Sequence, residues 1–273
     1  MSKAVPAVLA EPAPAKLNLA LHVRGRRPDG RHDIETIFAF CIDGDRVEAT
    51  EAEGLSLVLD GPFADDLPDG ADNLIIRAAH ALAAAADVPA NAALRLVKNL
   101  PVASGIGGGS ANAAATLRLL TRLWDLDPKH AEQVAPVLGS DVPACLLSMS
   151  ARGEGAGDKL LLLDAGVAGT PVLLVNPLRP LSTAAVFARW DGTDRGPLGN
   201  WREGRNDLQP PATGLVPEIA DILQCLHNLE GRSYCRMSGS GPTCFALFEN
   251  DAARDAAAAQ LPADWWHLAT WLR

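Results

Sequence analysis

The sequence predicts an α+β protein of two domains, residues 1–164 and 165–273. The 273 residues are enough to bury two hydrophobic cores of ordinary size. In the first part, strand-length segments of alternating polarity lie between helix-like segments, which is typical of a mixed or antiparallel sheet with helices. The last third reads helix, strand, strand, helix, strand, the order of a ferredoxin-like split β-α-β layer.

Residues 13–24 form the clearest strand. Leucines and a valine occupy every second position from 17 to 23, whereas Lys16, Asn18 and His22 fall on the opposite face. We therefore expect a half-buried strand with a polar face available for chemistry. A lone lysine on a strand is also typical of solvated surface, and the sequence alone does not separate the two interpretations.

The remaining elements follow from the same periodicities and from turn and cap residues. Strands are expected at 34–47, 55–59, 94–100, 144–149, 159–163, 172–176, 234–237, 243–248 and 266–271. Helices are expected from an Asp72 cap through Ala86, from Ser110 to Trp124, at 128–138, from a Ser182 cap through Ala188, and at 216–226 and 252–261.

A glycine-rich segment directly precedes the helix expected from Ser110. Four of the five residues at 105–109 are glycine, which tolerates positive φ and lets another group approach the backbone closely. Ser110 is a good N-cap. Such a loop directs several N–H groups and the positive end of a helix dipole at one point, which is typical of a phosphate site. The predicted loop comprises Pro101, Val102, Ala103, Ser104, Gly105, Ile106, Gly107, Gly108, Gly109, Ser110 and Ala111.

The loop does not match several common nucleotide motifs. A Walker A loop ends in Gly-Lys-Ser/Thr, whereas this one ends Gly109-Ser110-Ala111. The third glycine of a dinucleotide fingerprint is missing, and Arg95, Lys98 and Asn99 make the preceding segment too polar for a buried parallel strand. The chain contains no His-Arg-Asp or Asp-Phe-Gly triplet of a protein kinase. A flexible surface turn is the remaining alternative.

The composition and net charge of the chain argue against some classes of binding partner. With 48% hydrophobic and 21% charged residues, the chain has the make-up of an ordinary globular protein. Its net charge of −9 and pI near 5.1 argue against nucleic acid or an anionic membrane as the main partner. We expect phosphate groups to be bound locally, by backbone amides and a few placed cations.

The cysteines indicate the compartment. There are five, an odd number, widely spaced and without a C-x-x-C pattern. Free thiols in a reducing cytoplasm are the plain interpretation, with structural zinc as the alternative. The first eleven residues do not form a convincing export signal, because Pro6 interrupts the apolar stretch. We therefore expect a cytoplasmic protein.

Two further motifs carry candidate site residues. In the segment from Met237 to Thr243, two glycines alternate with serines, so that Ser240 and Gly241 could lie beside the phosphate loop. A plain hairpin turn is the alternative. Asp141 lies between an expected helix end and an expected buried strand, where an aspartate is also typical of a turn or cap.

Taken in order, these motifs resemble the GHMP kinase superfamily. The resemblance covers about residues 13–248 and implies a two-domain GHMP kinase fold. It also implies ATP-dependent phosphoryl transfer to an alcohol, with ATP and Mg²⁺ as cofactors. Two pieces point to members whose small-molecule acceptor carries a cytidine diphosphate. These two are Pro14-Ala15-Lys16-Leu17-Asn18 and Asp29-Gly30-Arg31-His32. The other motifs that carry the resemblance are the glycine loop, the Asp141 motif, Asn206-Asp207-Leu208 and Ser238–Thr243.

The resemblance implies a catalytic role for each matching residue. The loop 103–110 would hold the ATP phosphates through its amides. Asp141 would act as the general base toward the acceptor hydroxyl. Lys16 would keep Asp141 ionised and help neutralise the transferring phosphoryl group. Ser110 would contribute to Mg²⁺ coordination, together with water and phosphate oxygens.

It also implies how the acceptor is bound. Asn18 would contact the acceptor, His32 would hydrogen-bond the cytosine, and Phe187 would stack on that base. Thr183 would bind near the acceptor. The family usually has tyrosine where this chain has Arg31, whose guanidinium plane can stack on a base instead.

Other functions remain to be weighed against this one. A sibling GHMP kinase acting on a mevalonate-, homoserine- or sugar-like alcohol would carry the same core motifs. A non-catalytic nucleotide-binding module would keep the fold, but retention of both Lys16 and Asp141 argues against it. A dinucleotide-binding oxidoreductase fits the loop least. The expected oligomeric state is a monomer or a weak homodimer.

Overall fold

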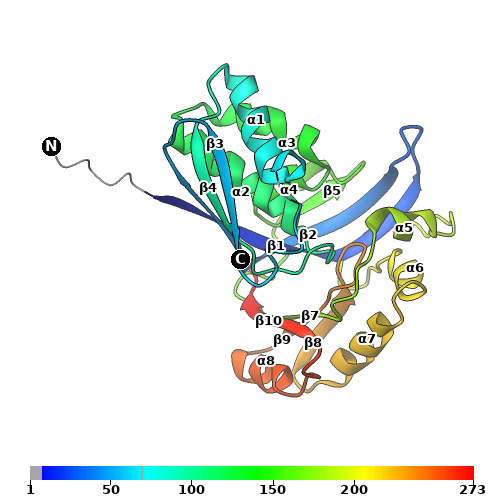
Figure 1. The fold of residues 1–273 in the computed structure, drawn as a ribbon. Helices are drawn as coiled ribbons and strands as arrows, with labels where there is room; N and C mark the ends of the chain where they lie inside the picture. The colour runs from blue at the N-terminus through cyan, green and yellow to red at the C-terminus, as the bar shows by residue number, and fades with distance from the viewer. Residues whose placement is uncertain (1–7, 69) are drawn as a thin grey trace. The chain divides into compact units, whose positions relative to one another are not determined.

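The computed structural model describes residues 8–68 and 70–273, which form two compact units (Figure 1). Unit one contains 8–14, 44–102 and 108–147, and unit two contains 15–43, 103–107 and 148–273. The sequence predicted two contiguous domains, whereas the units interleave along the chain. The reason is the length of strands β1 (Leu9–Arg26) and β2 (His32–Thr50), each of which contributes residues to both units.

Unit one joins a small sheet to a group of helices. The second half of β2 pairs antiparallel with β4 (Ala92–Val97), which pairs parallel with β3 (Leu55–Asp60). Four helices pack against one another beside these strands (Figure 1). They are α1 (Leu74–Ala86), α2 (Gly108–Leu123), α3 (Pro128–Leu138) and α4 (Val142–Leu147), preceded by the 3₁₀ turn Gly70–Asp72.

Three sequence predictions in unit one were wrong. Helix α1 is capped by Asn73, whose side chain accepts the Ile75 N–H at 3.0 Å, and Asp72 belongs to the preceding 3₁₀ turn. Helix α2 begins at Gly108, so Ser110 lies in its first turn instead of capping it. The strand expected at 144–149 is helix α4, because a short apolar run does not distinguish strand from helix by its periodicity.

Unit two contains strands of two sheets. The first half of β2 pairs with β5 (Ala151–Glu154), which pairs with β6 (Lys159–Leu162). The separate sheet has the order β10-β7-β9-β8, formed by Trp266–Trp271, Pro171–Asn176, Cys244–Phe248 and Arg232–Met237. Its helices are α5 (Thr183–Ala188), α6 (Gln209–Thr213), α7 (Glu218–Asn228) and α8 (Asp251–Ala258).

The order α7, β8, β9, α8, β10 confirms the predicted split β-α-β layer. Helices α7 and α8 both contact the strands of this sheet. Ile219, Ile222 and Leu226 of α7 recur at helical spacing and are fully buried. Each such side chain contributes about 1.5–3 kcal/mol on burial. These side chains belong to the hydrophobic core of unit two.

The cysteines are free, as predicted. No disulfide joins any of the five, all of which lie in the described ranges. Burial raises the pKa of the Cys41 and Cys244 thiols, so both are neutral and contribute apolar packing. Within residues 8–68 and 70–273, no helix combines the length and apolar composition that crossing a bilayer requires.

Candidate nucleotide and substrate site

Lys16 is buried within unit two. Its side chain is on the polar face of β1, and the residue is only 3% exposed. Its ammonium donates to Asn18 Oδ1 at 3.0 Å and lies 4.9 Å from the centroid of the Phe38 ring. The alternative of a solvated surface lysine is therefore wrong. Removing an ammonium from water is costly, and a buried lysine is more typical of a site than of a surface.

Asn18 is held in one orientation by Thr36. The Asn18 amide nitrogen donates to Thr36 Oγ1 at 2.8 Å, and that hydroxyl donates onward to Ala20 O at 2.6 Å. The amide oxygen therefore faces the Lys16 ammonium. Thr36, on β2, was not predicted as a site residue, because nothing in the local sequence distinguishes it from other polar strand positions.

The first part of the glycine loop packs directly against these residues. Ala103, Gly105 and Gly107 have φ values of 50°, 74° and 68°, which explains glycine at two of the three positions. The Lys16 N–H donates to Ile106 O at 2.9 Å. A Cβ at Gly107 would lie 3.1 Å from Lys16 Cβ. The loop thus follows the backbone and side chain of Lys16 closely.

The second glycine-rich segment locks this part of the loop in place. Ser238 Oγ donates to Gly105 O at 3.0 Å and accepts the Asn18 N–H at 3.2 Å. The Thr243 N–H donates to Ser104 O at 3.2 Å. A Cβ at Gly105 would approach Gly241 O to 2.5 Å, so only glycine allows this contact. The segment is a turn, closed by Ser238 N–H to Thr243 O, and also a packing surface.

Unit two also contains the residues predicted for the acceptor. The His32 and Phe187 rings are 4.7 Å apart and tilted by 31°, and Thr183 Oγ1 lies 2.8 Å from Ser240 Oγ. His32 Nε2 is buried without a hydrogen-bond partner among the described residues. Burial, reinforced by Arg26, lowers the pKa of His32, so the ring is neutral at pH 7. A neutral ring with an unsatisfied nitrogen suits hydrogen bonding to a base.

Arg31 is engaged elsewhere within the same turn. Its N–H and guanidinium both bind the carboxylate of Asp29, at 3.0 Å and 2.9 Å, and its side chain is exposed. Stacking of the Arg31 guanidinium on a base remains a prediction. It would require the Arg31–Asp29 ion pair to rearrange.

The rest of the loop belongs to unit one. Gly108, Gly109, Ser110 and Ala111 form the first turn of α2, whose N–H groups have no partner within the helix. Such a helix start is a site for anions. Pro101 and Val102 also belong to this unit.

A buried ion pair lies beneath the start of α2. The Lys98 ammonium, 1% exposed, donates to Asp45 Oδ2 at 2.7 Å and to Leu100 O at 2.6 Å. Asp45 Oδ1 accepts the N–H groups of Asn99 and Leu100. A Cβ at Gly108 would come within 3.3 Å of Lys98 Nζ. Burial lowers the pKa of Lys98 while Asp45 opposes that shift. The sequence alone indicates only that Lys98 makes its segment polar.

Asp141 lies in unit one, immediately before α4. Its carbonyl accepts the Cys145 N–H at 3.0 Å, which closes the first turn of that helix. Gly139 is the C-cap of α3, as expected from the sequence. The short connection from α3 to α4 therefore fixes the backbone at Asp141, and its side chain is half-buried.

The donor groups for a metal are few. In the described ranges, no three His, Cys, Asp or Glu side chains come together as metal ligands. Mg²⁺ typically keeps several waters and binds one or two protein oxygens plus phosphates. The Ser110 hydroxyl, at the start of α2, is the kind of oxygen that such an ion uses.

Comparison with known proteins defines the class. The family model for the GHMP kinases N terminal domain matches residues 73–149 of this chain. The family model for the GHMP kinases C terminal region matches residues 191–267. The chain belongs to the GHMP kinase family. A homoserine kinase structure from Cytophaga hutchinsonii, 16% identical, shares the fold with a TM-score of 0.71 over 99% of this chain and 98% of that one. The predicted GHMP kinase fold is thus confirmed.

Closer relatives define the group within that family. Two curated proteins named 4-diphosphocytidyl-2-C-methyl-D-erythritol kinase are similar over nearly their whole length. The Rhizorhabdus wittichii protein is 52% identical, covering 96% of this chain and 94% of its own. The Sphingopyxis alaskensis protein is 49% identical, covering 98% and 99%. A crystal structure of 4-(cytidine 5'-diphospho)-2C-methyl-D-erythritol kinase is 32% identical, with a TM-score of 0.83 over 97% of this chain and 99% of that one.

Proposed function

We propose that the protein is an ATP-dependent small-molecule kinase acting on 4-diphosphocytidyl-2-C-methyl-D-erythritol. It phosphorylates the 2-hydroxyl, giving the 2-phosphate and ADP, in non-mevalonate isoprenoid precursor biosynthesis. The observation that carries the proposal is the buried Lys16–Asn18 pair held against the glycine loop. The names of relatives at 43–52% identity support the substrate.

Phosphate binding is assigned to the glycine loop. The loop's backbone amides and the start of α2 would hold the ATP phosphates, because a helix N-terminus favours negative charge. In unit two, Ser238 and Gly241 restrain Gly105, so the loop is fixed before the nucleotide arrives. Fixed donors do not have to reorganise as charge develops, which is the main electrostatic advantage of an enzyme site.

Phosphoryl transfer is assigned to Asp141 and Lys16. The acceptor hydroxyl oxygen attacks the γ-phosphorus as the bond from that phosphorus to the ADP oxygen breaks. Asp141 orients the hydroxyl and accepts its proton. Lys16 neutralises charge on the transferring group, and Asn18 and Thr36 hold its ammonium in place. Bound Mg²⁺ would neutralise charge on the β- and γ-phosphates, with Ser110 as its protein contact.

Cytidine recognition is assigned to His32 and Phe187. The unsatisfied His32 Nε2 would hydrogen-bond the cytosine, and Phe187 would pack against that base. Thr183 would bind near the acceptor, beside Ser240. Arg31 would contribute only after leaving Asp29.

The test is an assay with ATP, Mg²⁺ and the diphosphocytidyl substrate. We expect transfer to the 2-hydroxyl, and a fall in kcat of several orders of magnitude in Asp141→Asn and Lys16→Met, with nucleotide binding retained in Asp141→Asn. Mevalonate, homoserine and galactose form the comparison panel. Activity on one of these alone would identify a sibling kinase, and nucleotide binding without any transfer would identify a binding module. A wild-type kcat in Asp141→Asn would remove Asp141 from the mechanism.

We further propose a cytoplasmic enzyme that is a monomer or a weak homodimer. The five free thiols support a reducing compartment. Light scattering over a range of protein concentrations tests the oligomeric state, and a dimer that persists on strong dilution would contradict this proposal.

A further inference from the structure

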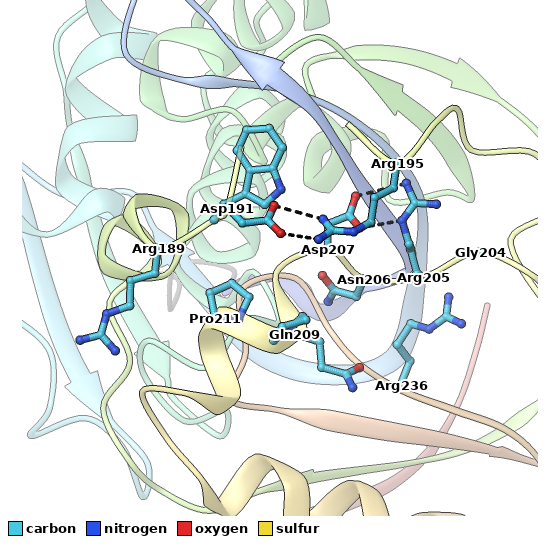
Figure 2. A pocket seen from close by; sticks show the side chains of 12 residues that line it. Arg189, Asp191, Arg195, Gly204, Arg205, Asn206, Asp207, Gln209, Pro211 and Arg236 are labelled. Carbon is cyan, nitrogen blue, oxygen red and sulfur yellow. Dashed lines mark hydrogen bonds and ion pairs between the residues drawn. The ribbon is translucent and has the colours of Figure 1, made fainter. Parts of the chain in front are cut away.

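The Asn206-Asp207-Leu208 motif has no role in the reaction as described so far, although it is one of the motifs that carry the family resemblance. Its two polar residues are each only 5% exposed. Asn206 borders a cavity of unit two beside the Arg205–Asp207 ion pair, and Figure 2 shows its side chain outside the dashed contacts of that pair. A buried asparagine in this position needs hydrogen-bond partners of its own.

The Asn206 side chain holds the second glycine-rich segment by its backbone. Its amide nitrogen donates to Met237 O at 2.9 Å and to Gly239 O at 2.8 Å, so both of its N–H bonds have an acceptor. The amide oxygen accepts the Leu208 N–H at 3.0 Å. Because Met237 and Gly239 are the two neighbours of Ser238, this one side chain restrains the backbone on both sides of that serine.

Ser238 connects the restrained backbone to the proposed site. The residue is fully buried, and its hydroxyl donates to Gly105 O at 3.0 Å and accepts the Asn18 N–H at 3.2 Å. Gly239 packs on the same two residues, since a Cβ there would lie 2.9 Å from Gly105 O and 3.1 Å from Asn18 Oδ1. Asn18 Oδ1 is the oxygen that accepts the Lys16 ammonium. A displacement at Ser238 would therefore reach both the glycine loop and the lysine.

The backbone around Asn206 is itself attached to β1. The Leu21 N–H donates to Arg205 O, and the Asp207 N–H donates to Leu21 O, each at 2.9 Å. The Asp207 carboxylate also accepts the Val23 N–H at 2.8 Å. Strand β1 carries the proposed catalytic lysine, so Asn206 links that strand to the glycine-rich segment from a fixed base.

We propose that Asn206 is a positioning residue for phosphoryl transfer. All three of its hydrogen bonds go to backbone groups, so it acts on the reaction through the protein. It fixes Ser238, whose hydroxyl has to meet Gly105 O and the Asn18 N–H at the same time. Donors and charges that are fixed in advance are the main source of electrostatic catalysis. This inference rests on the proposed function, because it assigns Asn206 to that reaction.

The test compares Asn206→Ala with wild type in the kinase assay with ATP and Mg²⁺. The variant removes both donors to Met237 O and Gly239 O. We expect kcat to fall about a hundredfold, the typical effect of a small misplacement of reacting groups. KM for the diphosphocytidyl substrate should change little, because its base is assigned to His32 and Phe187. A fall in kcat at constant KM is the signature of a contribution to the transition state alone.

Hydrogen exchange at the Asn18 amide provides a readout that a general loss of stability would not reproduce. In the wild type this N–H is bonded to Ser238 Oγ inside the protein. Its exchange should be faster in Asn206→Ala, while the amides of Ile222 and Leu226 in α7 keep their wild-type rates. A purely structural role would accelerate all three together.

A double variant tests the route through Ser238. Ser238→Ala should itself lower kcat, because it removes the hydroxyl that Gly105 and Asn18 share. In that background, adding Asn206→Ala should lower kcat by a much smaller factor, because residues that act along one path are not additive. A further fall of about a hundredfold would show that Asn206 acts by another route.

Asn250→Ala is the control for stability. Asn250 is exposed, and its side chain caps α8 by accepting the Ala253 N–H at 2.9 Å. Its loss should lower the melting temperature and leave kcat at the wild-type value. If Asn206→Ala does not fold, the milder Asn206→Ser decides, since its hydroxyl can still donate to one carbonyl, and its kcat should fall less.

The outcomes separate this inference from the proposed function. A wild-type enzyme that transfers phosphate to the diphosphocytidyl substrate, together with unchanged kcat in a folded Asn206 variant, would overturn the inference alone. A rise in KM at wild-type kcat would also overturn it, because Asn206 would then serve substrate binding. Absence of any transfer by the wild type would overturn the proposed function and this inference with it.

Discussion

Gly107 cannot carry a side chain without displacing Lys16. Its φ of 68° is unfavourable for other residues, and a Cβ would lie 3.1 Å from Lys16 Cβ and 3.2 Å from its Cε. Gly107→Ala should therefore shift the ammonium off Asn18 and lower kcat about a hundredfold, the typical effect of a small misplacement. Steady-state kinetics measure it. An unchanged kcat would show that the position of Lys16 is not critical.

Gly109→Ala is the matched comparison for stability. Gly109 lies in the first turn of α2 without positive φ, and the nearest atom to an added Cβ is Leu74 Cδ2 at 3.9 Å. Alanine is favoured over glycine in a helix by up to about 1 kcal/mol. Gly109→Ala should thus raise the melting temperature or leave it unchanged, whereas Gly107→Ala should lower it.

The Lys98–Asp45 pair should be essential for the stability of unit one. Lys98→Met leaves a buried carboxylate with only two backbone N–H donors, and breaking such a pair typically costs about 3–5 kcal/mol. Urea unfolding measures the loss, which Asp45→Asn in the same chain should partly restore. Arg179→Met, which breaks an exposed pair with Glu218, should have no measurable effect. Wild-type stability in Lys98→Met would contradict the assignment.

At the scale of elements, β1 is tied to the segment 196–207 through His22. The ring donates from Nδ1 to Gly196 O at 3.1 Å and accepts the Arg205 N–H at Nε2, 3.2 Å away. Burial lowers the pKa of His22; the hydrogen bond to Gly196 O opposes this shift, Arg205 adds to it, and Asp207 and Glu35 oppose it more weakly. Protonation would also remove the acceptor that Arg205 uses. The neutral ring is therefore the form that the fold selects.

This arrangement predicts a loss of stability in acid. The folded pKa of His22 lies below its unfolded value, so the unfolded chain binds more protons as the pH falls below about 6.5. The stabilising contribution is complete above that pH and declines as the pH falls through the folded pKa. His32 contributes with the same sign. Urea unfolding at about pH 7.5 and about pH 5.5 should show a smaller difference in His22→Gln than in wild type.

The exposed His80 on α1 provides the control for that comparison. His80→Gln should keep the wild-type difference in unfolding free energy between the two pH values. An equal pH dependence in wild type and His22→Gln would show that the ring is not held neutral by the fold.

Most elements could be predicted because their signals are local. Asp127 and Ser182 cap α3 and α5 with their own side chains, and the periodicity of 128–138 gave the bounds of α3. The strand predicted at 144–149 was wrong where helix α4 (Val142–Leu147) lies, because a short apolar run fits either a strand or a helix. The burial of Lys98 could not be predicted either, since its partner Asp45 lies 53 positions away.

At the scale of the whole molecule, the order of the motifs along the chain was enough to predict the family. Within unit two, the contacts between residues of different motifs agree with that prediction. Lys16, Asn18, Gly105 and Ser238 meet although 220 positions separate Asn18 from Ser238. The interleaving of the units was missed. It depends on which segments the two halves of β1 and β2 pair with, and alternating polarity predicts a strand but not its partners.

This interleaving predicts that the chain cannot be divided at residue 164. The first half of β2 is hydrogen-bonded to the C-terminal end of the chain. The Arg273 N–H donates to Phe40 O at 2.9 Å, and Cys41 and Leu272 form an isolated antiparallel β-bridge. Further along β1, Asp207 accepts the Val23 N–H at 2.8 Å. All these contacts lie within unit two, and cutting at 164 removes one partner of each.

Residues 1–164 and 165–273, expressed separately, should therefore lack cooperative thermal transitions, and their amide spectra should show little dispersion. The cut separates strands from their hydrogen-bonding partners and exposes apolar faces that are buried in the intact chain. Each fragment then buries too little apolar surface to offset the conformational entropy lost on folding. Mixing the two fragments should restore part of the native spectrum, because together they contain every partner. A sharp unfolding transition in 1–164 alone would instead support two contiguous domains, with the contacts to 207 and 272–273 contributing little to folding.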